Sequence, residues 1–301
     1  MARLLALACL LITVPGCGSD ARSAPTAKAT ATAAAQVDAF DAPAAFARIK
    51  QQVAVGQRPA GSPQLRKLAK SLRRQLPGGR FEKLPGEPGL RNIVADVPGT
   101  KPALVVGAHY DTLVKPKGFV GANNGAAGSA IVIELARELA AASDRPANAS
   151  EVQFVLFDGE EPAAGLPEEQ TDFYHAGLRG SRAYVKRHKA GVGAMVLLDY
   201  VAGKGLQLPK EVSSNAELWA LIRASAQRTG HISVFPDRDD VALTDDHTPF
   251  LMQGIPAVDM IDWSYPGHTL QDGLDQLSVA SVDAVGETLT DFIARWTPPA
   301  P

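Results

Sequence analysis

The sequence predicts an α/β protein, organised as a three-layer α/β/α sandwich around a mixed, mainly parallel central sheet. Short apolar runs typical of buried strands alternate with segments of helical periodicity along most of the chain. No repeat of fixed length appears, and Pro- and Gly-rich turns separate the segments. Behind an N-terminal leader, roughly 260 residues remain for one large core, so we expect a single domain of ordinary α/β size.

Each element follows from its local pattern. The strand-like runs are RNIVADV, ALVVGA, VQFVLF, AMVLLD and IPAVDMI. Helical patterns cover residues 42–55, 63–75, 126–142, 178–188, 214–229 and 279–296. Breaks are expected at Pro98 and Gly99, at residues 77–79 and in the loop from Pro162 to Gly177.

The N-terminus has the features of an export signal. Arg3 precedes the apolar run LLALACLLITV, which is too short to span a bilayer. The tetrapeptide VPGC at residues 14–17 resembles the lipobox of bacterial lipoproteins, in which Cys17 becomes the acylated first residue. We therefore expect a signal peptide at residues 1–16 and a lipid anchor that holds the protein at the membrane of the bacterial cell envelope. The alternative is a plain secretory signal and a secreted or periplasmic protein.

The cysteines and the following segment agree with a tethered domain. Cys9 would leave with the signal, so Cys17 would be the only thiol and no intrachain disulfide could form. Residues 17–36 are rich in Ala, Thr and Ser without apolar periodicity, as expected of a flexible tether. We place the catalytic domain at residues 37–301.

Charge and motif content exclude two other classes of function. Thirty basic and 32 acidic side chains are interspersed, with a formal net charge of −2, so nucleic acid is not an expected partner. The chain contains no G-x-S-x-G elbow, which disfavours a serine hydrolase.

Metal-binding and acid–base side chains follow several of the expected strands. His109 follows ALVVGA, Asp158, Glu160 and Glu161 follow VQFVLF, Asp199 ends AMVLLD, and His268 comes after IPAVDMI. Alone, each is more often a structural or solvated residue. Because ligands bind at the carboxyl ends of parallel strands, however, these side chains are expected to converge. Carboxylate and imidazole are zinc ligands, and a neighbouring free carboxylate can carry a proton.

Taken together, several motifs resemble the zinc exopeptidase superfamily, which contains leucyl-type aminopeptidases and glutaminyl-peptide cyclotransferases. The resemblance covers roughly residues 46–296. The motifs are AHYDT from Ala108, GANNGAAGSA from Gly121, FDGEE from Phe157, GLRGSRAY from Gly177, LLDYVAG from Leu197, DDHTPFL..GIP from Asp245 and GHT..D from Gly267.

The resemblance implies a role for each matching residue. Glu160 becomes the general acid–base, and Glu161 and His268 become ligands of one zinc ion. His109 and Asp199 match the ligands of a second zinc in the aminopeptidases, whereas in the cyclotransferases the Asp belongs to a catalytic hydrogen-bond network. Asp111 would orient His109 from behind the site. The remaining two matching residues, Asp245 and Asp246, are candidates for the network around Glu160.

Two positions depart from the pattern of this superfamily. Asn124 stands where the family has an aspartate that bridges two metals, and a neutral amide offers one oxygen and no charge. One zinc is therefore expected, with a second possible, and Asn124 is a candidate ligand through that oxygen. Gly267 stands where the cyclotransferases have Trp, so one pocket wall is expected to be missing.

Three functions are compatible with these residues. A cyclotransferase would use zinc to polarise the γ-amide oxygen of an N-terminal glutamine, while Glu160 moves a proton from the attacking amine to the departing ammonia. An aminopeptidase would use Glu160 to activate a water on the metal. A catalytically weakened peptide-binding lipoprotein is the third. We expect a zinc enzyme that acts on peptide or protein N-termini.

Overall fold

The computed structural model describes residues 39–143, 145–163 and 172–298. The signal peptide, Cys17 and the tether expected for residues 1–36 lie outside the described residues, and the domain boundaries stay predictions. Within the described chain, no helix is both long enough and apolar enough to cross a membrane.

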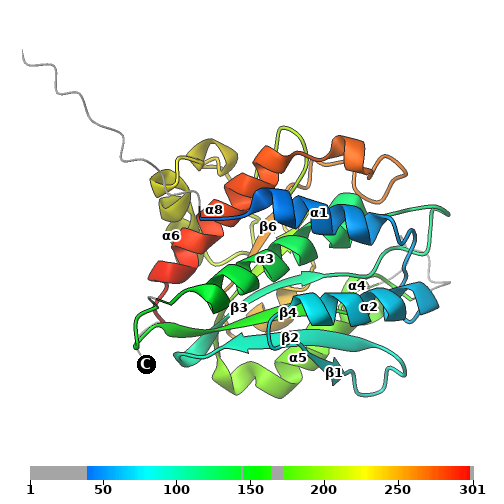
Figure 1. The fold of residues 1–301 in the computed structure, drawn as a ribbon, viewed down its shortest axis with the longest axis horizontal. Helices are drawn as coiled ribbons and strands as arrows, with labels where there is room; N and C mark the ends of the chain where they lie inside the picture. The colour runs from blue at the N-terminus through cyan, green and yellow to red at the C-terminus, as the bar shows by residue number, and fades with distance from the viewer. Residues whose placement is uncertain (1–38, 144, 164–171, 299–301) are drawn as a thin grey trace, which may run out of the picture. The chain divides into compact units, whose positions relative to one another are not determined.

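A six-stranded mixed sheet forms the centre of the fold (Figure 1). Its strands are β1 (Arg80–Lys83), β2 (Arg91–Val97), β3 (Thr100–His109), β4 (Ser150–Phe157), β5 (Val192–Asp199) and β6 (Ala257–Ile261). The spatial order is β1-β2-β4-β3-β5-β6. The pairs β4–β3, β3–β5 and β5–β6 are parallel, and β1 and β2 extend the sheet with antiparallel pairs. The predicted fold class is confirmed.

Helices cover both faces of the sheet. One layer contains α1 (Ala42–Val53), α2 (Pro63–Gln75), α3 (Gly128–Ala141), α6 (Ala216–Arg228) and α8 (Val279–Arg295), whose buried side chains belong to the larger apolar cluster. The other contains α5 (Arg179–His188) and α7 (Thr248–Leu251), which pack in a smaller cluster. Short turns complete the fold: η1 (Ala122–Ala127), α4 (Phe173–Ala176), η3 (Lys189–Gly191), η4 (Ile232–Val234) and η5 (Leu274–Gln276).

Strand β3 shows why the apolar runs predicted a sheet buried on both sides. Leu104, Val106 and Ala108 belong to the larger cluster, and Val105 belongs to the smaller one. Side chains alternate between the faces of a strand, so a continuous apolar run is needed when helices cover both faces.

Several helices begin where a capping side chain precedes the periodic pattern. Asp41, Ser62 and Asn215 each accept a hydrogen bond from a backbone amide of the first turn, at 2.9–3.1 Å. The six predicted helices and five predicted strands are present with ends shifted by a few residues. The structure adds three elements of four residues each, β1, α4 and α7, which are too short to produce a periodic signal.

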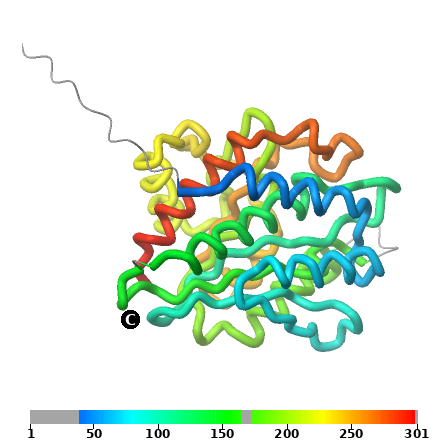
Figure 2. The backbone as a smooth tube through the Cα atoms, in the orientation of Figure 1, coloured from blue at the N-terminus to red at the C-terminus, as the bar shows by residue number. Residues whose placement is uncertain are grey.

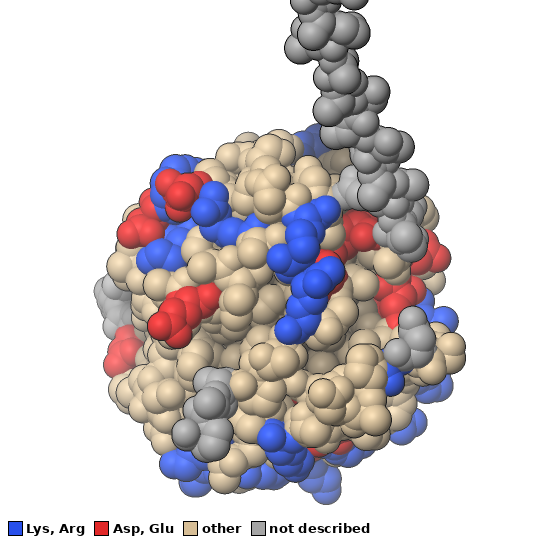
Figure 3. All heavy atoms as spheres, turned by 90° about the vertical axis from the view of Figure 1, so that its left-hand side faces the viewer, with Lys and Arg blue, Asp and Glu red and all other residues tan. Residues whose placement is uncertain are grey.

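The first and last helices of the described chain lie side by side. Figure 2 shows α1, in blue, running beside α8, in red, and the two helices are in contact. On the face drawn in Figure 3, acidic and basic side chains occur in small groups separated by uncharged residues.

Candidate active site

The candidate site lies at the carboxyl ends of the parallel strands. His109 is the last residue of β3 and Asp199 is the last residue of β5. Glu160 and Glu161 follow the end of β4 by a few residues, and His268 lies in the loop after β6. These strands run in the same direction, so the structure brings their ends to one edge of the sheet.

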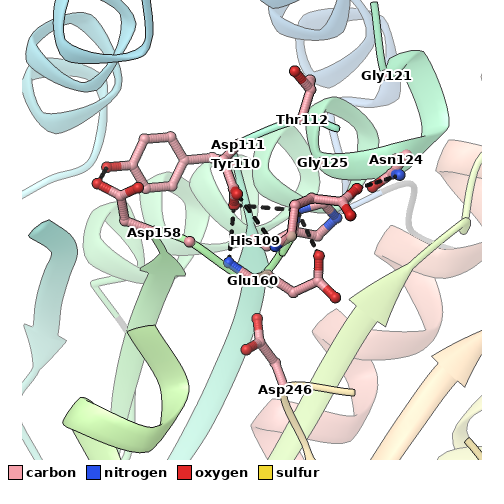
Figure 4. A network of polar contacts seen from close by, with 12 residues as sticks. His109, Tyr110, Asp111, Thr112, Gly121, Asn124, Gly125, Asp158, Glu160 and Asp246 are labelled. Atoms are coloured by element: carbon pink, nitrogen blue, oxygen red, sulfur yellow. Dashed lines mark hydrogen bonds and ion pairs between the residues drawn. The ribbon is translucent and has the colours of Figure 1, made fainter. Parts of the chain in front are cut away.

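His109 is buried beside three carboxylates, two of which, Asp111 and Glu160, are labelled in Figure 4. Its Nδ1 atom lies 3.6 Å from Asp111 Oδ1 and 3.6 Å from Glu160 Oε2, and its Nε2 atom lies 3.5 Å from Asp199 Oδ1. Burial opposes the charged imidazolium, but these carboxylates outweigh burial and hold the pKa of His109 well above its usual range. In this arrangement His109 neutralises part of the negative charge of the site.

Asp111 faces His109 and also holds the backbone of the two glutamates in position. Its Oδ1 atom accepts a hydrogen bond from the backbone N–H of Glu160 at 3.2 Å, and its Oδ2 atom accepts one from the N–H of Glu161 at 3.3 Å. Asp111 therefore ties the loop after β4 to the chain just after β3, through the backbone of both glutamates.

Glu160 and Glu161 are adjacent buried acids. Burial, followed by the charge of Glu161, raises the pKa of Glu160 well above its usual range. Burial also raises the pKa of Glu161 to about 7, although His268 opposes this shift. Strongly shifted neighbouring acids are typical of sites that transfer protons.

Glu161 faces two of the candidate metal ligands. Its Oε1 atom lies 3.8 Å from His268 Nε2 and accepts a 2.8 Å hydrogen bond from the Nδ2 atom of Asn124. Its Oε2 atom is buried without a hydrogen-bond partner in the part of the chain that the structure describes. This oxygen is the one that a cation could satisfy.

The two amides of the turn after β3 have different contacts. Asn123 Oδ1 accepts a hydrogen bond from the backbone N–H of Ala202 at 2.9 Å, which ties the turn to the chain beyond β5. Asn124 faces Glu161 instead. Gly125 has a φ of 86°, and a Cβ there would lie 2.6 Å from the Asp111 carbonyl oxygen, so only glycine fits at this position.

Asp245 and Asp246 occupy different positions. Asp245 lines the same cavity as Glu160, and burial together with the charge of Asp199 raises its pKa to about 6. Asp246 is fully buried and is not among the residues that line the cavity. Burial and the charge of Asp245 raise the pKa of Asp246 well above its usual range.

Asp158 does not join this group. Its Oδ2 atom accepts hydrogen bonds from the backbone N–H of Arg91 at 2.9 Å and from the Tyr110 hydroxyl at 3.1 Å. Asp158 therefore links the end of β4 to β2, and it lies beside the Tyr110 ring in Figure 4.

The cavity itself has a volume of about 230 Å³. Its polar lining comes from Asn124, Glu160, Asp199, Thr244, Asp245 and His268. Its apolar and aromatic lining comes from Phe173, Tyr200, Leu243, Ile261 and Trp263. A small cavity lined by both acids and apolar groups suits one amino-acid side chain.

Gly267 lies against the ring of Tyr200. A Cβ built on Gly267 would lie 2.3 Å from the hydroxyl oxygen of Tyr200 and 2.4 Å from its Cζ atom. The Tyr200 ring therefore occupies the space that a side chain at position 267 would need. The expected missing wall stays a prediction, and the ring of Tyr200, the residue after β5, packs against Gly267.

Sequence reasoning missed two residues that hold the site together. Arg58 is fully buried and donates to the carbonyl oxygens of Tyr110, at 3.3 Å, and Gly121, at 3.0 Å. Burial lowers the pKa of Arg58 to about 10, although Asp272 and Asp111 oppose the shift. No local pattern marks Arg58, because its partners are backbone atoms more than 50 residues away.

Asp272 is the second residue. It accepts hydrogen bonds from the backbone N–H groups of Asn123 at 2.7 Å and Asn124 at 3.1 Å, and from the Tyr265 hydroxyl at 2.8 Å. It thereby ties the loop that carries His268 to the turn that carries Asn124. Asp272 ends the GHT..D motif, which could have indicated this role.

The site contains candidate ligands for a zinc ion. Glu161 and His268 are of the ligand types that zinc takes, and Glu161 has a buried oxygen without a partner. Asn124 could complete this set through its amide oxygen, since the two ends of an amide are assigned from its hydrogen bonds. In the described ranges, no group of three or more His, Cys, Asp or Glu residues is arranged to hold a metal.

The fold places this chain in the zinc exopeptidase superfamily. The chain belongs to peptidase family M28, whose family model matches residues 92–293.

Comparisons with known proteins give the relatives of this chain. It is 26% identical over 238 residues to the glutaminyl-peptide cyclotransferase of Bos taurus, with 68% of this chain and 66% of the relative covered. The chain thus spans just under two thirds of the length of that relative.

Two solved structures are similar as well. The glutaminyl cyclase of Porphyromonas gingivalis has a TM-score of 0.72 and 28% identity, covering 85% of this chain and 99% of that one. A leucine aminopeptidase precursor from Bacteroides thetaiotaomicron has a TM-score of 0.74 and 25% identity, covering 86% and 98%.

Proposed function

We propose that this protein is a zinc-dependent enzyme that acts on peptide N-termini and converts an N-terminal glutamine into pyroglutamate. The observation that carries the proposal is the position of Glu160, which lines one cavity with His268 and precedes the buried acid Glu161. The similarity to glutaminyl-peptide cyclotransferases supports cyclisation. Asn124 supports it too, because a neutral amide does not bridge two metals and cyclisation needs only one.

Cyclisation requires one bond to form and one to break. The α-amine nitrogen attacks the γ-amide carbon of the same residue, the bond from that carbon to the amide nitrogen breaks, and ammonia leaves. The amine loses a proton and the leaving group gains one, so one carboxyl group that accepts and returns a proton is sufficient.

Glu160 has the environment that this proton transfer needs. Burial and the charge of Glu161 hold its pKa well above its usual range, so Glu160 exchanges a proton closer to neutral pH than an exposed glutamate does. Its backbone N–H is held by Asp111, which fixes the start of the side chain. Glu161, His268 and the Asn124 oxygen would hold the zinc ion, which when bound polarises the γ-carbonyl oxygen.

An aminopeptidase is the second candidate. The similarity to the leucine aminopeptidase precursor favours it, and Glu160 would then act as the base for an attacking water. In that case His109 and Asp199, which lie 3.5 Å apart, are the candidates for holding a second metal. The third candidate is a catalytically weakened peptide-binding protein, because the neutral amide of Asn124 is a weak metal ligand.

Parallel assays separate these three functions. Purified protein is analysed for zinc per chain and assayed with a glutaminyl peptide, by ammonia release, and with a leucyl anilide. Ammonia release with little anilide hydrolysis supports the cyclase. Anilide hydrolysis with little ammonia release would identify an aminopeptidase. If neither substrate is turned over at full zinc loading, the result would favour the peptide-binding protein.

The variant Glu160→Gln tests the proposed proton carrier. The amide keeps the shape of the side chain but cannot carry the proton, so turnover should fall by a factor on the order of 10² or more. Zinc content and melting temperature should change little. The matched control is Glu217→Gln on α6, an exposed glutamate far along the chain from the site, which should retain full activity. Normal turnover in Glu160→Gln would remove Glu160 from the mechanism.

A further inference from the structure

A second hollow adjoins the cavity of the candidate active site. It has a volume of about 210 Å³ and is lined by Tyr200, Trp263 and residues 265–269. Tyr200, Trp263 and His268 line both hollows. The two spaces are therefore neighbours that share one wall of side chains, and we call the second one the aromatic hollow.

The shared wall is built around Tyr200. Its ring lies against the Trp263 ring with a centroid distance of 6.2 Å and an interplanar angle of 20°, and against the Tyr265 ring at 5.6 Å. The His268 ring is nearly perpendicular to it, with a centroid distance of 6.2 Å. Tyr200 has a left-handed backbone with a φ of 48°, which is unfavourable for a residue with a side chain. Such a conformation persists where surrounding contacts hold it, as at binding sites.

Gly267 makes this arrangement possible. Any larger residue there would collide with the Tyr200 ring, since even a Cβ would lie 2.3 Å from its hydroxyl oxygen. The rim is held in place by Asp272, which accepts a hydrogen bond from the Tyr265 hydroxyl at 2.8 Å. The aromatic hollow is thus a built surface and not a gap between loops.

The lining of the aromatic hollow selects the chemistry of its ligand. It contains the rings of Tyr200, Trp263 and Tyr265, together with Pro266, His268 and Thr269, but no Asp, Glu, Lys or Arg. Trp263 is 47% exposed, which leaves much of a large apolar ring open to a bound group. The neighbouring cavity, by contrast, is lined by the acids Glu160, Asp199 and Asp245. An aromatic or large aliphatic side chain fits the hollow, and an acidic one would be repelled by the acids next to it.

We propose that the aromatic hollow binds the side chain of the second residue of a peptide whose N-terminal residue lies in the active-site cavity. This proposal rests on the proposed function in assuming a peptide N-terminus. Consecutive Cα atoms are about 3.8 Å apart, so a residue next to the one in the cavity reaches a hollow that shares its wall. The enzyme should then prefer peptides with Phe, Tyr or Leu at the second position.

The test compares two peptides that differ only at the second position, glutaminyl-phenylalanine amide and glutaminyl-glycine amide. With wild-type protein, kcat/KM should favour the phenylalanine peptide by a factor on the order of ten. Trp263→Ala should bring this ratio close to one, and Trp263→Phe should largely restore it. The matched control is Leu221→Ala, an exposed apolar residue on α6, which should leave the ratio unchanged.

A binding arm separates this proposal from the proposed function. Binding of both peptides to the full-length protein is measured by calorimetry, which requires no turnover. Tighter binding of the phenylalanine peptide that is lost in Trp263→Ala supports the aromatic hollow even if neither peptide is turned over. Equal kcat/KM and equal affinity for the two peptides, or a preference that survives Trp263→Ala, would overturn it, as would the absence of binding and turnover for both.

A double-variant experiment tests the pairing of Tyr200 with Gly267. Gly267→Ala should reduce the preference for phenylalanine, because the new methyl group displaces the Tyr200 ring. In a Tyr200→Ala background, where the ring is absent, adding Gly267→Ala should have no further effect. Independent, additive effects of the two substitutions would contradict the shared wall.

Discussion

The side-chain amide of Asn124 donates a 2.8 Å hydrogen bond to Glu161. This contact stabilises the ionised form of Glu161, since it opposes the rise in pKa that burial causes. To bind a cation through its oxygen, Asn124 would have to turn its amide and give up this hydrogen bond, and it would add no charge to the site.

The first prediction concerns Asn124→Asp. The new carboxylate would lie beside Glu161, so the metal-free variant should melt at a lower temperature than wild type because two buried acids repel each other. Zinc affinity should rise by about tenfold or more, because a charged ligand replaces a neutral one. Calorimetric titration with zinc measures both affinity and stoichiometry.

Two controls belong to this experiment. Asn124→Ala removes the amide without adding a charge, and it should not gain affinity. Asn124 precedes Gly125, a sequence prone to deamidation, so peptide mass analysis must show that the wild-type residue is intact. Identical affinity and stoichiometry in wild type and Asn124→Asp would show that position 124 does not contact the metal.

The second prediction concerns Asp272→Asn. Asp272 accepts three hydrogen bonds from two separate segments, and an amide keeps only part of this accepting capacity. A buried N–H group then lacks its partner, so the free energy of unfolding should fall by roughly 1–3 kcal/mol. Urea unfolding measures it. Asp275→Asn, at an exposed position three residues on, should change stability by less than about 0.5 kcal/mol. Equal stability of the two variants would refute the role of Asp272.

The third prediction uses the pKa of Glu211, a buried residue outside the cavity. Glu211 accepts hydrogen bonds from the backbone N–H groups of Ser213 and Leu243, both at 2.9 Å, and lies 3.5 Å from His247. Burial alone would raise the pKa of Glu211, but the hydrogen bonds from these residues outweigh burial and lower it to about 2. Leu243 lines the cavity, so Glu211 also holds part of its wall.

The pH dependence follows from the sign of this shift. A pKa lowered from 4.5 to about 2 corresponds to roughly 3 kcal/mol of stability. This contribution is fully present above pH 4.5 and is lost as the pH falls toward 2. The difference in unfolding free energy between wild type and Glu211→Gln should therefore stay constant from pH 7 to pH 5 and shrink below pH 4.5. A difference that grows on acidification would contradict the assignment.

The fourth prediction concerns location. We propose that Cys17 carries the lipid anchor, and that Cys17→Ser moves the protein from the membrane fraction to the soluble fraction. Acyl chains contribute about 0.8 kcal/mol per buried methylene group, so their loss should be visible on fractionation. Immunoblots of membrane and soluble fractions provide the measurement, and a variant that stays with the membrane would exclude the lipobox.

The local sequence was sufficient to predict most of the fold. Runs such as ALVVGA in β3 and AMVLLD in β5 are buried on both faces, so they are apolar throughout and easily recognised. β1 escaped prediction because its four residues, RFEK, lie at the edge of the sheet and are only partly buried. α4 and α7 are likewise too short for a helical period to appear.

The candidate site was foreseen where residue type and strand end were enough. His109, Glu160 and Asp199 could be placed at one edge of the sheet because the ends of parallel strands meet there. Asp158 follows the same rule in sequence but turns toward Arg91 and Tyr110. The end of a strand thus fixes where the backbone of a residue lies. The direction of its side chain depends on the neighbouring residues.

By itself, then, the sequence determined the order of strands and helices, the acids at the strand ends and the neutral residue at position 124, since these depend on residues close together in the chain. Only the tertiary structure decided that Asn124 pairs with Glu161, that the Tyr200 ring fills the space beside Gly267, and that Asp272 ties two loops together. Each of these contacts joins residues at least 37 positions apart. Which distant partners meet is set by how the whole core packs, and no local pattern encodes it.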